Sequence, residues 1–134
     1  MLPDNIAACV HEGDLEGVVT WLTTGGDCDA RFHAPDNSVR DSTLLMMSSG
    51  LGHEALVTAL LQHGASVNLQ NSYGGSALQA ASAEGYDGIV IKLCAAKADL
   101  ALTDKNGNTA LALAEKNQHA ACVQALKDKA ASWF

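Results

Sequence analysis

The stretch Asn71-Ser-Tyr-Gly-Gly-Ser-Ala-Leu-Gln-Ala-Ala81 decides the fold, because the chain contains a second version of it. That version is Asp104-Lys-Asn-Gly-Asn-Thr-Ala-Leu-Ala-Leu-Ala114, which matches in residue type and begins 33 residues later. The same shift toward the N-terminus reaches a third version, whose apolar run follows Thr43. A period of this size is typical of stacked repeats, in which each unit buries its apolar face against its neighbours.

Hydroxyl and glycine residues mark the ends of short helices in these repeats. Thr43, Ser76 and Thr109 each precede an apolar run, where a side-chain oxygen can accept a backbone hydrogen bond as an N-terminal cap. Gly52 and Gly85 follow two of the runs, where a left-handed residue turns the chain and glycine takes that conformation without steric cost. The pattern predicts one short helix before each glycine.

A second helix is predicted after each turn, opened by His53 in one repeat and by Tyr86 in the next. Apolar residues at helical spacing form one stripe per helix: Leu56, Val57, Leu60 and Leu61, then Ile89, Val90 and Leu93. At the front of the chain, Asp4 stands in the cap position and Gly13 in the glycine position. The sequence therefore predicts four helix pairs.

The pattern resembles the ankyrin repeat, and the stretch Gly52-His-Glu-Ala-Leu-Val-Thr-Ala-Leu-Leu-Gln-His-Gly-Ala-Ser-Val-Asn68 carries the resemblance at the family's spacing. The resemblance implies an all-α fold, a solenoid of four stacked helix-turn-helix repeats with connecting β-hairpin loops. The family's Thr-Pro-Leu-His phrase is altered here to Thr43-Leu-Leu-Met46, Ser76-Ala-Leu-Gln79 and Thr109-Ala-Leu-Ala112. Without the proline and the histidine, the first-helix turns are expected to be looser than usual.

The whole chain, 1–134, is interpreted as a single ankyrin-repeat domain. Its repeats cover about 1–37, 38–70, 71–103 and 104–130, followed by a tail at 131–134. The last repeat looks like a C-terminal cap, since Glu115, Lys116, Asn117 and Gln118 replace small or apolar residues. The aromatic pair Trp133-Phe134 in the tail is open to three interpretations: it folds back on the last helix, touches a partner, or marks a cut from a longer chain.

An insertion of six residues around Phe32-His-Ala-Pro-Asp-Asn37 separates the first repeat from the second. In solenoids, insertions form loops on one face, often the binding face. An exposed Phe32 beside Arg31 would be typical of an interface anchor. The alternatives are a tolerated surface loop, which costs little free energy, and a Phe32 that packs back on the first helix pair.

Composition limits the classes of function. The chain is 48% hydrophobic and 17% charged with a net charge of −7, which indicates one globular domain with no basic face for nucleic acid or an anionic membrane. No apolar run has the roughly 18 residues of a membrane span, and the start lacks the basic and apolar regions of a signal peptide. The expected location is the cytoplasm, with the nucleus as the alternative.

A search for catalytic chemistry finds little. The four cysteines, Cys9, Cys28, Cys94 and Cys122, lack zinc-ligand spacing and fall in core columns of the repeat, where a free thiol acts as a small hydrophobe. His53 and His119 share the column that opens the second helix, where the resemblance implies a structural hydrogen bond. No phosphate-binding glycine phrase occurs. We expect no enzymatic activity, no metal and no cofactor.

The resemblance instead implies recognition of a protein by a concave surface of hairpin tips and first helices. The residues in the partner-facing columns are His11, Glu12, Arg31, Val39, Arg40, Ser42, Leu51, Gln70, Ser72, Tyr73, Glu84, Thr103, Lys105, Asn106, Asn108, Lys116 and Asn117, with Phe32 added by the insertion. Arg40, Leu51 and Tyr73 are predicted to contribute most, since arginine and aromatic anchors dominate many interfaces.

The predicted function is a monomeric, non-catalytic interaction module that acts as a scaffold, an adaptor or an inhibitor. The alternative is a regulatory ankyrin segment of a larger enzyme, channel or signalling protein. A modification is also predicted at Asn68, which resembles the asparagine hydroxylated in many ankyrin repeats, although Ser66 replaces the usual acidic residue.

Overall fold

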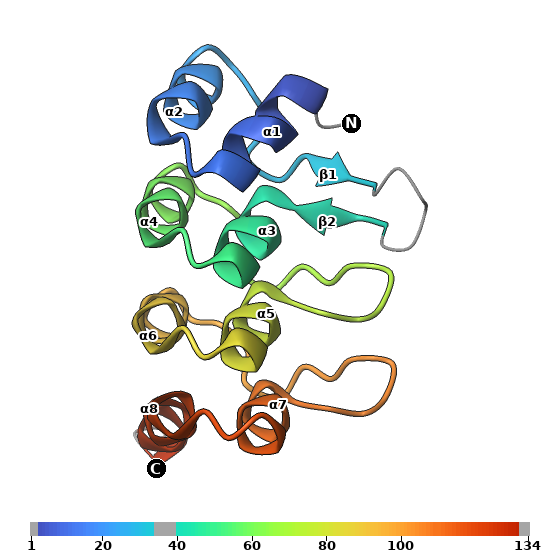
Figure 1. Cartoon of the computed structure of the whole chain (residues 1–134), viewed down its shortest axis with the longest axis vertical. Coiled ribbons are helices and arrows are strands. Elements are labelled where there is room, and N and C mark those ends of the chain that lie inside the picture. The colour runs from blue at the N-terminus through green and yellow to red at the C-terminus, as the bar shows by residue number, and fades with distance from the viewer. Residues whose placement is uncertain (1–2, 34–39, 132–134) are drawn as a thin grey trace.

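The computed structural model describes residues 3–33 and 40–131, and the eight helices in these residues are stacked as four pairs (Figure 1). The first helices of the pairs form one layer and the second helices form the other, with loops projecting beside the first helices. The elements in chain order are α1 (Asp4–Glu12), α2 (Leu15–Thr23), β1 (Arg31–Phe32), β2 (Ser42–Thr43), α3 (Leu44–Leu51), α4 (Glu54–Gln62), α5 (Ala77–Glu84), α6 (Asp87–Ala95), α7 (Ala110–Lys116) and α8 (Ala120–Ala131). This architecture confirms the predicted all-α solenoid.

The predicted helix caps are present at the starts of α3, α5 and α7. The hydroxyl oxygens of Thr43, Ser76 and Thr109 each accept the backbone N–H three residues later, at 3.2, 3.3 and 3.1 Å. Gly52 and Gly85 end α3 and α5 with φ of 80° and 87°, in the left-handed region. These local signals therefore set the helix boundaries as predicted.

The first helix is an exception, and the prediction that Asp4 caps it is wrong. Helix α1 begins at Asp4 itself, with Pro3 in the cap position and no side-chain cap. The carboxylate of Asp4 lies in the first turn, where a negative charge interacts favourably with the helix dipole. Helix α1 thus starts with weaker local support than α3, α5 and α7.

The expectation of looser turns at the first helices is wrong for α3 and α5. The Oε1 atom of Gln79 accepts the N–H of Ser76 at 2.6 Å, and the sulfur of Met46 lies 3.4 Å from the N–H of Thr43, so both helices have reciprocal caps. The Nε2 group of Gln79 also donates to the carbonyls of Leu102 and Asn108, both at 3.0 Å. Gln79 therefore ties α5 to the next loop.

The core lies between the two helix layers, and the imidazole rings of His53 and His119 each connect one repeat to the preceding one. The largest fully buried side chains are Leu44, Leu45, Leu56, Leu60, Leu78 and Leu93 with Val10, Val18, Val57 and Val90. The His119 ring donates from Nε2 to the carbonyl of Ala83 at 3.0 Å. It lies so close to Gly85 that an added Cβ would come within 2.6 Å of the ring. His53 bonds similarly to the carbonyl of His11 at 3.2 Å, which confirms the scaffold role of both histidines.

The connecting loops differ in their hydrogen bonding. Strand pairing among the described residues is confined to β1 and β2, which are antiparallel with Arg31 opposite Thr43 and Phe32 opposite Ser42. The two later loops are each closed by two backbone hydrogen bonds. The N–H of Asn71 donates to the carbonyl of Gly75 and that of Gly74 to Asn71, both at 2.9 Å, and the N–H of Asp104 donates to Asn108 and that of Gly107 to Asp104, both at 3.0 Å. Within residues 3–33 and 40–131, none of the helices has the length and apolar character required to cross a bilayer.

Candidate partner-binding surface

Backbone hydrogen bonds join the loop tips into a row. The N–H of Ser72 donates to the carbonyl of Arg40 at 2.9 Å, and one repeat later the N–H of Lys105 donates to the carbonyl of Tyr73 at 2.9 Å. The hydroxyl of Ser72 also accepts the N–H of Arg40 at 2.9 Å. The loops therefore form a connected surface rather than independent projections.

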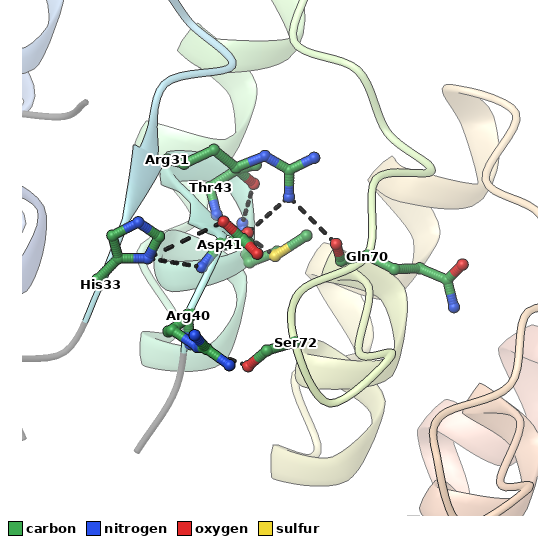
Figure 2. A network of polar contacts seen from close by, with 8 residues as sticks. Arg31, His33, Arg40, Asp41, Thr43, Gln70 and Ser72 are labelled. Carbon is green, nitrogen blue, oxygen red and sulfur yellow. Dashed lines mark hydrogen bonds and ion pairs between the residues drawn. The ribbon is translucent and has the colours of Figure 1, made fainter. Parts of the chain in front are cut away.

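Arg31 and Gln70 connect the bases of these loops, as Figure 2 shows for Arg31. The Nη1 atom of Arg31 donates to the carbonyls of Asp41 at 2.6 Å and Gln70 at 3.1 Å. One repeat later, Nε2 of Gln70 donates to the carbonyls of Gly74 at 2.8 Å and Thr103 at 3.1 Å. Each side chain bonds once within its own loop and once to the next repeat. We call these two residues the loop staples.

Several predicted binding residues thus contribute to the scaffold. Arg31 is half-buried, and its guanidinium is engaged by backbone carbonyls. Phe32 is half-buried and packs against the core, which favours the packing alternative over the exposed anchor. Ser42 is only 9% exposed, so its side chain is not presented on an open surface, contrary to the prediction. Arg31, Phe32 and Ser42 are therefore less exposed than the sequence suggested.

Other predicted residues do lie on the surface. Tyr73 and Leu51 are 53% and 40% exposed. Ser72 and Asn108 are half-buried, and the exposed members of the set are His11, Glu12, Arg40, Gln70, Glu84, Thr103, Lys105, Asn106, Lys116 and Asn117. Val39 and residues 34–37 of the insertion lie outside the described residues. A binding role for the exposed side chains stays a prediction.

A groove that the sequence did not reveal lies between the third repeat's loop and the first helices. It has a volume of about 280 Å³ and is lined by Ser42, Met46, Met47, Asn71, Tyr73, Gly75, Ser76, Gln79, Ala80, Ala83, Asp104 and Leu113. We call it the central groove. Its walls come from α3, α5, α7 and two loops, so four separate stretches of sequence build it. Methionine suits such a wall, because its flexible side chain adapts to irregular gaps. The adjacent Met46 and Met47 were therefore the feature of the sequence that could have indicated the groove.

Two equivalent turn residues, Asn71 and Asp104, line this groove. Oδ1 of Asn71 accepts the N–H groups of Tyr73 and Gly75, both at 3.0 Å. Oδ1 of Asp104 accepts those of Asn106 and Asn108, both at 2.9 Å. The backbone hydrogen bonds lower the pKa of Asp104 from its ordinary value, and Lys116 acts in the same direction. Both side chains accept two backbone N–H groups of their own turn, but Asp104 also carries a negative charge.

In the segments that follow α2, α4 and α6, carboxylate and amide side chains also connect consecutive repeats. The Asp29 carboxylate accepts the N–H of Ser66 at 2.8 Å and its hydroxyl at 2.7 Å. Oδ1 of Asn68 accepts the N–H of Asp99 at 2.7 Å. Asn68 is exposed, so its amide is accessible while it supports the scaffold. Modification of Asn68 stays a prediction.

Metal and thiol chemistry have weak support in the described part of the chain. Asp27, Cys28 and Asp29 bring ligand atoms within 4.8 Å of one another, but Asp27 accepts the N–H of Asp29, and the Asp29 oxygens accept from Ser66. Cys94 and Cys122 are buried, whereas Cys9 and Cys28 are half-buried against the core. Burial is the main factor that raises the pKa of all four thiols, so none is activated as a nucleophile.

Comparison with known proteins agrees with this architecture. A family model for ankyrin repeats, in three copies, matches residues 5–104. The chain is also 32% identical over 106 residues to calmodulin-binding transcription activator 4 of Arabidopsis thaliana, an alignment that covers 75% of this chain and 10% of that protein. The chain therefore spans about a tenth of the length of this curated relative. By its sequence match and its stacked helix pairs, the chain belongs to the ankyrin repeat family.

Proposed function

We propose that this chain is a non-catalytic module that binds a partner protein through its loop tips, first helices and central groove. Ankyrin repeats are generally protein–protein interaction modules, and the family is typically non-catalytic. The observation that carries the proposal is the central groove, which joins the exposed Tyr73 to apolar walls on three helices. A scaffold, an adaptor or an inhibitor would each use such a surface.

Exposed apolar side chains on both layers allow a matched test. Tyr73 and Leu51 lie on the proposed surface, whereas Ile91 and Leu15 lie on second helices and are 56% and 40% exposed. The double variant Tyr73→Ala/Leu51→Ala should lose a protein that the unchanged chain captures from lysate. The variant Ile91→Ala/Leu15→Ala removes similar apolar area from the other layer and should retain it. Equal capture by both variants would rule out the proposed surface.

A second function is favoured by the length of the relative. Because the matched relative is about ten times as long as the aligned region, the chain also fits a regulatory ankyrin segment of a larger protein. An antibody against this chain would distinguish the two on a blot of native extract. A product near 13.9 kDa favours the stand-alone module, and a much larger product favours the segment.

We further propose that the chain acts as a monomer in the cytoplasm, with the nucleus as the alternative location, and that Asn68 is hydroxylated there. A gain of about 16 Da at Asn68 in cellular protein would support the modification. Fractionation followed by the same antibody would locate the chain. Unmodified Asn68 in every cell extract tested would refute the modification without affecting the binding proposal.

A further inference from the structure

The central groove combines three kinds of group that together suit one class of side chain. Met47, Ala80 and Leu113 are half-buried apolar residues in its lining. Tyr73 contributes an aromatic ring that is 53% exposed. Asp104 contributes the carboxylate, and it is the one acidic or basic residue among the described residues that line the groove.

The turn that Asp104 closes does not require a charged side chain. Asn71, at the equivalent position one repeat earlier, accepts the same pair of backbone N–H groups through a neutral amide. Asp104 uses Oδ1 for that pair, while Oδ2 has one hydrogen-bond partner among the described residues, the Asn108 amide, at a long 3.5 Å. Asp104 is therefore a groove-lining residue whose carboxylate has spare accepting capacity, although Lys116 already lowers its pKa, and the other lining residues are uncharged.

Long cationic side chains match this combination. Lysine and arginine lay apolar stems along apolar surfaces while their charged heads seek a carboxylate or an aromatic face. The whole chain carries a net charge of −7, which attracts basic rather than acidic segments. We propose that the central groove receives a lysine or arginine side chain from the partner, with the stem against Met47 and Leu113 and the head between Asp104 and Tyr73. This inference rests on the proposed function and specifies the chemistry of the partner.

The test uses small probes of known chemistry. Amide resonances of the isotope-labelled chain would be followed by NMR during titration with Nα-acetyl-lysine N-methylamide or its arginine analogue. The norleucine analogue has the same stem without the charge and serves as the matched probe. A ligand of this size is expected to bind with a dissociation constant of about 1 mM and to shift Gly75, Gln79 and Leu113. The norleucine probe should bind about fivefold more weakly.

The equivalence of the two turns provides matched variants. Asp104→Asn recreates the turn that Asn71 already forms, so the fold is retained while the charge is removed. It should weaken lysine binding about fivefold and leave norleucine binding unchanged. Asn71→Asp adds a second carboxylate to the same groove and should strengthen lysine binding. Circular dichroism would verify that both variants are folded.

The outcomes separate this inference from the proposed function. Equal binding of the lysine and norleucine probes, no saturable shift, or an Asp104→Asn variant with unchanged lysine affinity would each overturn the cationic occupant. If a captured protein still depends on Tyr73 and Leu51 but not on Asp104, the binding module stands and the cationic occupant fails. If the lysine probe binds but capture of every protein is independent of Tyr73 and Leu51, the protein-binding proposal fails.

Discussion

At the residue scale, two adjacent serines in α3 show how much one hydrogen bond matters in the core. Ser48 and Ser49 are both fully buried. The hydroxyl of Ser48 donates to the carbonyl of Leu44 at 2.8 Å. Within residues 3–33 and 40–131, the hydroxyl of Ser49 has no hydrogen-bond partner, and the same is true of Ser82 one repeat later. A buried polar group without a partner retains its full cost of desolvation.

We therefore expect Ser49→Ala to raise the free energy of unfolding by about 1 kcal/mol more than Ser48→Ala. Both substitutions lie in the same helix, so the gain in helix propensity is shared and cancels in the comparison. Urea unfolding of the two variants measures the difference. If both change stability equally, the hydroxyl of Ser49 is satisfied in solution.

Asp104 gives a prediction for pH. Because hydrogen bonds lower the native pKa of Asp104 below its ordinary value of 3.8, its ionised form stabilises the fold. This contribution is fully present above the ordinary pKa and is lost as the pH falls through the lowered native pKa. In Asp104→Asn the contribution is absent at every pH.

The stability advantage of the unchanged chain over Asp104→Asn should therefore be constant near neutral pH and shrink below about pH 4. Urea unfolding at a series of pH values measures it, and the difference between the two proteins cancels the titration of the other carboxylates. An advantage that grows on acidification would contradict the assignment of a lowered pKa.

At the element scale, the loop staples determine how firmly one repeat holds the next. Arg31 and Gln70 occupy equivalent positions and bridge equivalent pairs of carbonyls. Hydrogen bonds from a charged donor are the stronger kind. Arg31→Met should therefore destabilise the chain by about 1–2 kcal/mol and Gln70→Met by about 1 kcal/mol.

Methionine keeps most of the apolar stem in both staple variants, so the comparison isolates the polar head. Denaturant unfolding gives the free energies, and hydrogen exchange at Thr43 would show whether the first loop loosens in Arg31→Met. Unchanged exchange together with unchanged stability would show that the Arg31 hydrogen bonds are not maintained in solution.

These elements also show what the sequence could reveal. Thr43, Ser76, Gly52 and Gly85 act through local backbone geometry, so their type and spacing predicted the helix ends. The partners of Arg31 are backbone carbonyls, which every residue carries, and no pattern of side chains indicates them. For the same reason the sequence placed Arg31 on the binding surface rather than among the staples.

The central groove was missed for a different reason. Four stretches build it, and their relative placement depends on how far each repeat rotates against the next, which residue types do not encode directly. The exposed Tyr73 could be predicted because it lies at a loop tip. Phe32 could not be placed, since an aromatic in an insertion fits both a surface anchor and a core contact, and the structure shows it packed against the core.

At the scale of the whole molecule, negative charge is concentrated at one end. The first 30 residues contain six carboxylates, Asp4, Glu12, Asp14, Glu16, Asp27 and Asp29, and no lysine or arginine. Helix α1 also lacks a side-chain cap and ends at Glu12, where a negative charge opposes the helix dipole. The first helix pair should therefore be the first to open.

We expect amides in residues 4–23 to exchange hydrogen faster than those in 77–95, with the order measured by mass spectrometry. Raising the salt concentration to about 0.5 M should slow exchange in 4–23 by a few-fold, because it screens repulsion among the carboxylates. The interior pair in 77–95 serves as the internal control. Equal salt effects in both regions would locate the weakness in the missing cap rather than in the charge.

The hydrogen-bonded row of loop tips has a consequence for the rate and thermodynamics of association. Because Arg40 is held by Ser72 and Tyr73 by Lys105 before any partner arrives, the entropy of ordering these loops is already lost on folding. Recognition at these tips should then proceed by docking of preorganised backbone, with side-chain rotations as the main adjustment. Any conformational entropy lost on binding would come chiefly from the partner.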